Sequence, residues 1–425
     1  MRIAVVGAGI VGVTTAYDLP AAGHEVTVFD RRDTIAAGTS FANAGVVAPG
    51  YVTPWSAPGM ARKVISQWWS SHAAVRVRPT FSPRTLGWLW RWWRACGRRR
   101  YAANRQRMQR LAFYSRERLH ELTQTLALDY ERSAGYLVLL RGPKDLAAVK
   151  PGLELLAAAG TRFSLIDAAR CHQIEPGLNP DTPLHAAIHL PDDEVANCRQ
   201  FATLLRTQAQ SRGATFRLLT EVLAVTPGTA PALTLRGDEG AGETRSERFD
   251  AVVVCAAVDS RALLRPLGVR LPLLAVNGYS VTAPLRLDPQ HPDRGPRSGV
   301  MDERFKVAVS RLGNRVRVAG GAEIGPGLDR MNERSLATLY KVLNDWYPGA
   351  AQMAQAQVWK GARPMLPDGP PVIGASGAPG VWLNLGHGSS GWALACGSAR
   401  LLAGRIGGRD GAIDAEGLGI ERLRR

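Results

Sequence analysis

The chain has 425 residues, 45% of them hydrophobic, which is enough for two or three domains with apolar cores and excludes a disordered protein. Its formal net charge is +17, and its five cysteines are far apart and odd in number, which argues against disulfides and a zinc site and for a reducing compartment. No apolar run approaches the roughly 18 residues of a membrane span, and the first strand begins too early for a signal peptide. We therefore expect a cytoplasmic protein, or one on the cytoplasmic face of the inner membrane.

The first thirty residues carry the strongest local pattern. An apolar strand at residues 3–6 runs directly into the turn Gly7-Ala8-Gly9-Ile10-Val11-Gly12, a helix follows, and a second strand at residues 26–29 ends in Asp30. This order and spacing are typical of a strand–turn–helix unit that binds the ADP half of a dinucleotide.

Each residue type in this unit has a physical reason. Gly7 permits the tight turn, Gly9 lets a pyrophosphate approach the backbone, and Gly12 lets helix and strand pack closely. The helix N-terminus offers free N–H groups to phosphates, and Asp30 is placed to accept ribose hydroxyls. Pro20 must shorten or kink the last turn of the helix.

The stretch from Thr34 to Arg116 contains no Asp or Glu but fourteen Lys and Arg, and seven of the eleven tryptophans. Its densest part is Leu86-Gly87-Trp88-Leu89-Trp90-Arg91-Trp92-Trp93-Arg94, followed by Arg98-Arg99-Arg100. Interleaved Trp and Arg suit the headgroup zone of an anionic bilayer. Internal packing of the tryptophans beneath a solvated basic face is an equal alternative. Nucleic acid is not expected as a partner, because no recognition module is present.

The remaining elements follow in chain order. We predict helices over much of 60–128 and over 144–159 (interrupted by Pro151), 199–212, 335–346 and 391–402, and strands at 136–140, 163–166, 215–219, 222–225, 251–256, 278–282, 306–310, 315–319 and 380–384. Residues 226–247 predict a hairpin of exposed strands. The acidic run at residues 192–194 is expected to be a solvated loop.

Two further glycine-rich segments bear on the cofactor. Residues 39–45 (TSFANAG) follow Asp30 by about ten residues, and their small side chains allow backbone contacts along a second nucleotide segment and a ring edge. Near the other end, residues 384–392 (NLGHGSSGW) form a second strand-to-helix turn, whose helix N-terminus would stabilise negative charge on a flavin.

These patterns predict an α/β fold with a discontinuous Rossmann-like nucleotide domain and an inserted mixed or antiparallel sheet domain. We assign residues 1–60, 191–271 and 346–425 to the nucleotide domain, 61–129 to a helical Trp/Arg-rich segment, and 130–190 with 272–345 to a substrate-binding domain.

The motifs VVGAGIVG, TSFANAG, PGY, DDEVANC, NGYSVT, GARPMLPDGPPVIG and NLGHGSSGWALACGS together resemble the FAD-dependent D-amino-acid dehydrogenase family, small-subunit type, within the glycine oxidase/D-amino-acid oxidase class. The resemblance covers residues 1 to about 402. It implies FAD as the cofactor, no metal, and oxidative deamination of a D-amino acid to a 2-oxo acid and ammonia, by hydride transfer from Cα to flavin N5.

The resemblance also implies residue roles. Arg363 would pair with the substrate carboxylate, Tyr279 would hydrogen-bond the same group, and Tyr51 would face the substrate. The implied cofactor-binding positions are Gly7, Ala8, Gly9, Ile10, Val11, Gly12, Asp30, Arg31, Arg32, Thr39, Ser40, Ala42, Asn43, Ala44, Gly45, Val222, Ala256, Gly361, Gly386, His387, Gly388, Ser389, Ser390 and Gly391. For His387 we expect a backbone-type contact rather than catalysis.

The electron acceptor stays open at this point. A quinone at a membrane surface would give a role to the Trp/Arg-rich segment, whereas an amino-acid or secondary-amine oxidase of the glycine, sarcosine or D-proline type would use oxygen. An NAD-dependent Rossmann dehydrogenase is disfavoured by the second glycine turn and by the absence of a His or Lys base motif.

Overall fold

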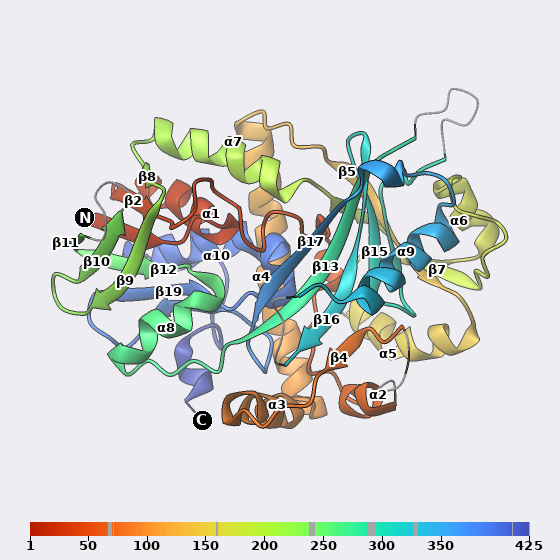
Figure 1. The fold of residues 1–425 in the computed structure, drawn as a ribbon, viewed down its shortest axis with the longest axis horizontal. Coiled ribbons are helices and arrows are strands. Elements are labelled where there is room, and N and C mark those ends of the chain that lie inside the picture. The colour runs from red at the N-terminus through yellow and green to blue at the C-terminus, as the bar shows by residue number, and fades with distance from the viewer. Residues whose placement is uncertain are drawn as a thin grey trace.

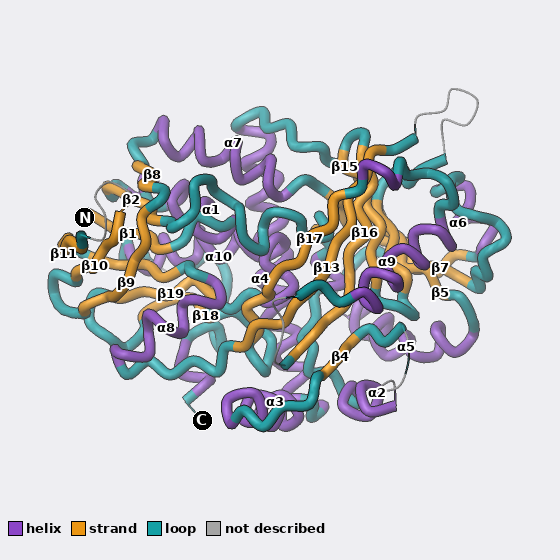
Figure 2. Tube along the Cα trace, viewed as in Figure 1, coloured by secondary structure: helices purple, strands orange, loops and turns teal. Residues whose placement is uncertain are grey.

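Two large β-sheets lie next to each other in the computed structural model, which describes residues 1–66, 70, 72–158, 160–237, 243–286, 294–325, 330–409 and 411–424. Both chain termini lie at the side of the six-stranded sheet, and the ten-stranded sheet stands at the other side (Figure 1). Helices and strands alternate on the first side, whereas strands dominate the second (Figure 2). The predicted α/β class is confirmed.

The six-stranded sheet has the order β18-β19-β12-β1-β2-β8 and is parallel except for the β18–β19 pair. Its strands are β1 (Arg2–Val6), β2 (Glu25–Phe29), β8 (Thr215–Arg217), β12 (Ala251–Val254), β18 (Val372–Ala375) and β19 (Val381–Leu385). One face of this sheet packs against three helices, α1 (Ile10–Asp18), α7 (Cys198–Ser211) and α10 (Gly391–Ile406), and forms a common hydrophobic core with them. On the other face lie α8 (Ser260–Leu264) and the small sheet β9 (Thr220–Thr226), β10 (Ala232–Gly237) and β11 (Thr244–Arg248). Burial on both faces explains the fully apolar run of β12.

The ten-stranded sheet is mostly antiparallel and follows the order β17-β13-β16-β15-β14-β5-β7-β3, with β4 paired to β16 and β6 to β7. Its strands are β3 (Val46–Val47), β4 (Val75–Val77), β5 (Ser133–Leu140), β6 (Ser164–Ile166), β7 (Ala186–Val195), β13 (Leu274–Pro284), β14 (Gly299–Asp302), β15 (Val307–Leu312), β16 (Arg315–Ile324) and β17 (Gln357–Met365). Helix α9 (Glu333–Trp346) packs its apolar side against one face. The opposite face packs on residues of α5 (Pro143–Ala158) and α3 (Pro83–Ala95) and on the loop that contains Ala42 and Ala44.

Five further helices lie around the ten-stranded sheet and its junction with the six-stranded sheet (Figure 1). They are α2 (Met60–Ser66), α3 (Pro83–Ala95), α4 (Arg98–Thr125), α5 (Pro143–Ala158) and α6 (Ala168–Ile174). The long helix α4 runs through the middle of the molecule and packs on α10, while α2 and α3 lie together at one edge (Figure 1).

Two prolines affect helices differently. Helix α1 ends at Asp18 and a short 3-10 turn begins at Pro20, as the sequence predicts. The predicted interruption at Pro151 is wrong, because α5 continues through it as one helix. A proline removes one backbone hydrogen bond and kinks a helix, but the rest of the helix can continue.

The domain boundaries stay a prediction, and they divide the strands differently from the sheets at four places. Strand β3, the end of β7 and the whole of β17 pair with the ten-stranded sheet, although the predicted boundaries place them in the nucleotide domain. Strand β4 also pairs with this sheet, although it falls in the predicted helical segment. A strand's pairing partner is set by tertiary contacts that its own residues do not specify.

Candidate active site

A single cavity of about 2260 Å³ runs between the two sheets. Ligand pockets for single small molecules measure roughly 300–1,000 Å³, so this cavity has room for a dinucleotide and a further molecule. All but two of the positions predicted to bind cofactor or substrate line it. The exceptions are Ala8 and Gly12, two buried residues of the first glycine turn.

The first glycine turn has the close packing that its sequence predicts. Gly7 has φ of +107°, a conformation that favours glycine, and a Cβ on Gly12 would lie 1.8 Å from the Gly7 carbonyl oxygen. A Cβ on Gly9 would meet only the Ser40 hydroxyl, at 3.5 Å, although Gly9 lines the cavity. The backbone is therefore bare where a pyrophosphate would approach it.

Asp30 closes this end of the cavity. Its carboxylate accepts hydrogen bonds from the backbone N–H of Ala8 at 2.7 Å and of Arg32 at 3.0 Å. These bonds fix the carboxylate at the turn and leave further lone pairs able to accept ribose hydroxyls.

The loop of residues 39–45 is fastened to the ten-stranded sheet. Ser280 and Ser310 donate to the carbonyl oxygens of Ala42 and Ala44 at 2.8 and 2.7 Å, and Arg317 donates to that of Asn43 at 2.9 Å. The loop therefore lies along the cavity with its backbone held by three strands.

The second glycine turn lies on the same cavity. Residues 386–391 line it and lead into α10, whose N-cap residue Ser390 makes no side-chain capping bond. His387 is buried, its ring contacts Ser398 at 3.0 Å, and burial lowers its pKa to about 3. His387 is therefore neutral at ordinary pH, and its side chain contacts Ser398 of helix α10, while its backbone forms a bridge with Met365.

These observations fit FAD. The bare turn at Gly9 and the Asp30 carboxylate suit the AMP portion, and the uncapped helix α10 meets the cavity at the other glycine turn. The single cavity joins both regions.

Arg363 is a half-buried cation with no carboxylate partner among the described residues. It lies on β17, and its Nη1 donates to the Gly321 carbonyl oxygen at 2.7 Å. Trp55 faces the guanidinium, with 5.8 Å between Cζ and the ring centroid. Burial alone lowers the pKa of Arg363 to about 10, so it remains charged at neutral pH. What is exposed of it faces the cavity. A half-buried cation without a carboxylate partner favours binding of an anion.

The predicted partnership of Tyr279 with Arg363 needs correction. A side chain at Gly278 of β13 would point toward the Arg363 guanidinium on β17. Tyr279 is the next residue of β13, so its side chain lies on the opposite face of the sheet. The Tyr279 ring packs in the core beneath α9, and its hydroxyl donates to Glu323. Although Tyr279 borders the cavity, its hydroxyl is not directed to the group that Arg363 would bind.

Tyr51 lines the cavity as predicted, and it brings in two residues that the sequence did not indicate. Its hydroxyl donates to Glu303 and accepts from Lys306 Nζ at 3.0 Å, and Lys306 also pairs with Glu303. Glu303 and Lys306 both line the cavity. They belong to a turn without any local sequence signal.

The acidic run at residues 192–194 is not the solvated loop that we expected. It continues strand β7, and Asp193 and Glu194 are 2% and 3% exposed. Glu194 pairs with Arg132 at 2.8 Å and contacts His120, and Asp193 lies 3.6 Å from Arg116. The basic partners come from distant segments and compensate the charge of Glu194, whereas burial raises the pKa of Asp193 to about 7.

The Trp-rich segment is divided between the interior and the surface. Trp88 is buried and donates from its indole to the Met365 carbonyl oxygen at 3.1 Å, whereas Trp90 and Trp93 are 57% and 55% exposed and stack with centroids 5.0 Å apart. Trp68 and Trp69 lie outside the described residues. Among the residues that the structure describes, no helix is long and apolar enough to span a bilayer.

Comparisons with known proteins agree over nearly the whole chain. Residues 2–405 match the family model described as FAD dependent oxidoreductase. A D-amino acid dehydrogenase of Rhizorhabdus wittichii is 44% identical over 99% of this chain and 100% of its own length. A D-amino acid dehydrogenase of Cereibacter sphaeroides is 43% identical over 99% of this chain and 95% of its own.

Among solved structures, iminodiacetate oxidase from Chelativorans sp. superposes with a TM-score of 0.72 and 21% identity. The match covers 98% of each chain. At this identity, the likeness supports the fold.

Proposed function

The chain belongs to the FAD dependent oxidoreductase family and uses FAD, and from this premise we propose that it is a D-amino acid dehydrogenase. The reaction would convert a D-amino acid, water and an oxidised acceptor to a 2-oxo acid, ammonia and the reduced acceptor. The observation that carries the proposal is the Arg363 guanidinium, which is half-buried, faces the cavity and has no carboxylate partner among the described residues.

Arg363 would bind the substrate carboxylate. A guanidinium is planar and has five N–H donors, of which one is bonded to Gly321, so a bidentate pair with a carboxylate remains open. Trp55 covers the guanidinium, which restricts its movement and its access to water. A lysine would give neither the fork geometry nor the stacking.

FAD, when bound, supplies the acceptor for the hydride that leaves the substrate's α-carbon. The protein's part is to orient the substrate and to shape the charge around the ring. Thr39, Ala42 and Asn43 line the cavity on one side, and the N-terminus of α10 supplies a partial positive charge on another. His387 is neutral and is held by Ser398, so it is not assigned the role of a base.

We infer that the electrons pass to a quinone at an anionic membrane surface. Ile65 and Trp93 line the cavity and are also 71% and 55% exposed, so the cavity reaches the surface between α2 and α3. This apolar surface also includes Phe81, Leu86 and Trp90, which are 96%, 48% and 57% exposed. Exposed arginines flank it at positions 91, 94 and 98–100. An apolar centre with a basic rim supports docking on anionic lipid.

The test is an anaerobic screen of the purified protein against D- and L-amino acids, following the flavin absorbance. We expect bleaching by D-amino acids only, followed by rapid recovery on adding a short-chain quinone. A colourless protein, or bleaching by L-amino acids alone, would overturn the assignment. Faster recovery with oxygen than with quinone would instead favour an oxidase.

A further inference from the structure

The turn between β14 and β15 presents an ion pair to the cavity. Asp302 and Val307 are paired across the two strands, so residues 303–306 form a four-residue turn. Glu303 and Lys306 face the cavity beside Tyr51, at the first and last positions of this turn. Lys306 has φ of +53°, in the left-handed region that non-glycine residues seldom adopt.

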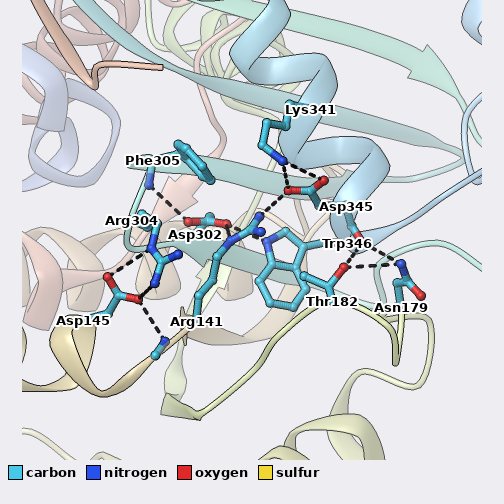
Figure 3. Close-up of polar contacts among 11 residues, drawn as sticks. Arg141, Asp145, Asn179, Thr182, Asp302, Arg304, Phe305, Lys341, Asp345 and Trp346 are labelled. Carbon is cyan, nitrogen blue, oxygen red and sulfur yellow. Dashed lines mark hydrogen bonds and ion pairs between the residues drawn. The ribbon is translucent and has the colours of Figure 1, made fainter. Parts of the chain in front are cut away.

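The outer side of the same turn is held by a buried polar network (Figure 3). Asp302, fully buried, accepts from Arg141 Nε and Trp346 Nε1, both at 2.7 Å, and from the Phe305 N–H at 3.1 Å. Arg304 pairs with Asp145 at 2.7 Å. The turn is therefore fixed from outside, and the positions of Glu303 and Lys306 in the cavity wall are fixed with it.

The strand register brings this ion pair close to Arg363. The Arg363 guanidinium reaches the Gly321 carbonyl on β16, and the neighbouring Gly320 is paired with Val307 on β15. A Cβ on Gly320 would lie 3.0 Å from the Lys306 carbonyl oxygen. Adjacent strands are about 4.8 Å apart, so the backbones at Gly321 and Lys306 are separated by roughly one strand spacing. Gly320 and Gly321 have no side chains to stand between the two cations.

Lys306 retains a donor for a ligand. Two of its three N–H groups have acceptors, Glu303 and the Tyr51 hydroxyl, and no acceptor for the third lies among the described residues. Its side chain is 37% exposed, whereas that of Glu303 is 10% exposed. Both Glu303 oxygens already accept a hydrogen bond. Lys306 is therefore the more accessible of the two groups, and it has an N–H left for a ligand.

We propose that Lys306, held by Glu303 and Tyr51, binds a hydrogen-bond acceptor on the substrate's side chain while Arg363 binds its carboxylate. This inference rests on the proposed function and adds a substrate class to it: amino acids whose side chain carries a hydroxyl, amide or carboxylate a few bonds from Cα. Cationic side chains would be disfavoured next to Lys306 and Arg363.

The experiment compares D-homoserine with D-norvaline, which have the same number of heavy atoms and differ by a terminal hydroxyl against a methyl. The wild-type holoenzyme should show a kcat/KM about tenfold higher for D-homoserine, because a hydrogen bond from a charged donor is lost with D-norvaline. In Lys306→Met the ratio should fall toward one, and the change should lie mainly in KM. Lys306→Arg, which keeps a charged donor, should retain a ratio above one.

Two controls separate the donor from effects on the turn. Lys306→Gly removes the same donor and suits the left-handed backbone, so it should lower the ratio as Lys306→Met does. Lys144→Met, at an exposed position of α5 that does not line the cavity, should keep the wild-type ratio.

A wild-type ratio near or below one, or a ratio unchanged in both Lys306→Met and Lys306→Gly, would overturn this inference and leave the proposed function intact. Failure of both D-amino acids to bleach the flavin, together with failure of D-alanine, would overturn both.

Discussion

The guanidinium of Arg363 occupies the space that a side chain at Gly278 would fill. A Cβ on Gly278 would lie 2.3 Å from Arg363 Nη2 and 2.5 Å from Cζ. The two residues sit on adjacent strands, β13 and β17, two pairs apart in the register. The position of the proposed carboxylate-binding group thus depends on the absence of a side chain 85 positions earlier in the chain.

Removing the cation should weaken substrate binding strongly without loss of the cofactor. In Arg363→Leu we expect kcat/KM for D-amino acids to fall by about 10²- to 10³-fold, because the carboxylate would lose a charged partner. Flavin content should equal that of the wild type. The matched control is Arg248→Leu, at an exposed position of β11, and steady-state kinetics with flavin spectra would check both. An unchanged KM in Arg363→Leu would contradict the role given to it.

Displacing the same cation by a methyl group should have a weaker effect in the same direction. In Gly278→Ala the Arg363 side chain must move, so we expect KM for D-amino acids to rise by about tenfold while FAD stays bound. The long arginine side chain can shift, which makes this change milder than Arg363→Leu. Steady-state kinetics would measure it, and wild-type KM in Gly278→Ala would show that the close approach has no functional consequence.

The first glycine turn should tolerate no side chain at position 12. In Gly12→Ala the new Cβ would clash with the Gly7 carbonyl oxygen, so we expect a loss of about 3 kcal/mol in the free energy of unfolding and poor retention of FAD. Thermal unfolding and flavin content are the measurements. The control is Gly87→Ala within α3, where a Cβ would meet nothing within 4 Å, and here we expect a gain of about 0.5–1 kcal/mol.

The exposed face of α3 should bind anionic vesicles. Replacing Trp90 and Trp93 together by Ser should lower binding to phosphatidylglycerol vesicles about tenfold, and neutralising positions 98–100 should weaken it by about 1 kcal/mol per charge at low salt. Vesicle sedimentation at two salt concentrations tests this, with Arg245→Gln and Arg248→Gln on β11 as charge controls. Equal binding by all variants would remove the membrane from the proposal.

Burial of Asp193 should make stability fall as pH rises. Burial raises its pKa to about 7, so the folded chain holds a proton that the unfolded chain releases near pH 4. Stability is then greatest below about pH 4 for this group and is lost between pH 4 and 7, by as much as about 4 kcal/mol.

The test is Asp193→Asn, which should flatten this fall and be more stable than the wild type at pH 8. Denaturant unfolding at pH 5 and pH 8 measures both. A wild-type difference that Asp193→Asn leaves in place would mean that another group is responsible.

The sequence predicts those parts of the fold and site whose signals are local. The turn from Gly7 to Gly12 and the second turn at residues 386–391 each combine strand, glycines and helix within a short span, and both line the cavity or support it as expected. The role of Arg363 is predicted from the resemblance alone. In the structure, its desolvation without a carboxylate partner among the described residues is an independent physical reason for that role.

The errors come from contacts between distant segments. The carboxylates of Asp193 and Glu194 are buried because arginines from α4 and the start of β5's loop reach them, which no local pattern shows. Tyr279 shares a motif with Gly278 but, by strand alternation, belongs to the other face of the sheet. Glu303 and Lys306 enter the cavity wall only because the sheet places their turn beside β16.

The short distance between strands β15 and β16 also affects which enantiomer of a substrate can react. A substrate held by its carboxylate at Arg363 and by its side chain at Lys306 has two of the four substituents of its α-carbon fixed on one sheet. In its mirror image, with those two substituents in place, the amine and the hydrogen exchange positions. Discrimination between enantiomers would then come from these two contacts together with the side on which the flavin meets the α-carbon, and it should weaken for substrates whose side chain is too short to reach the second contact.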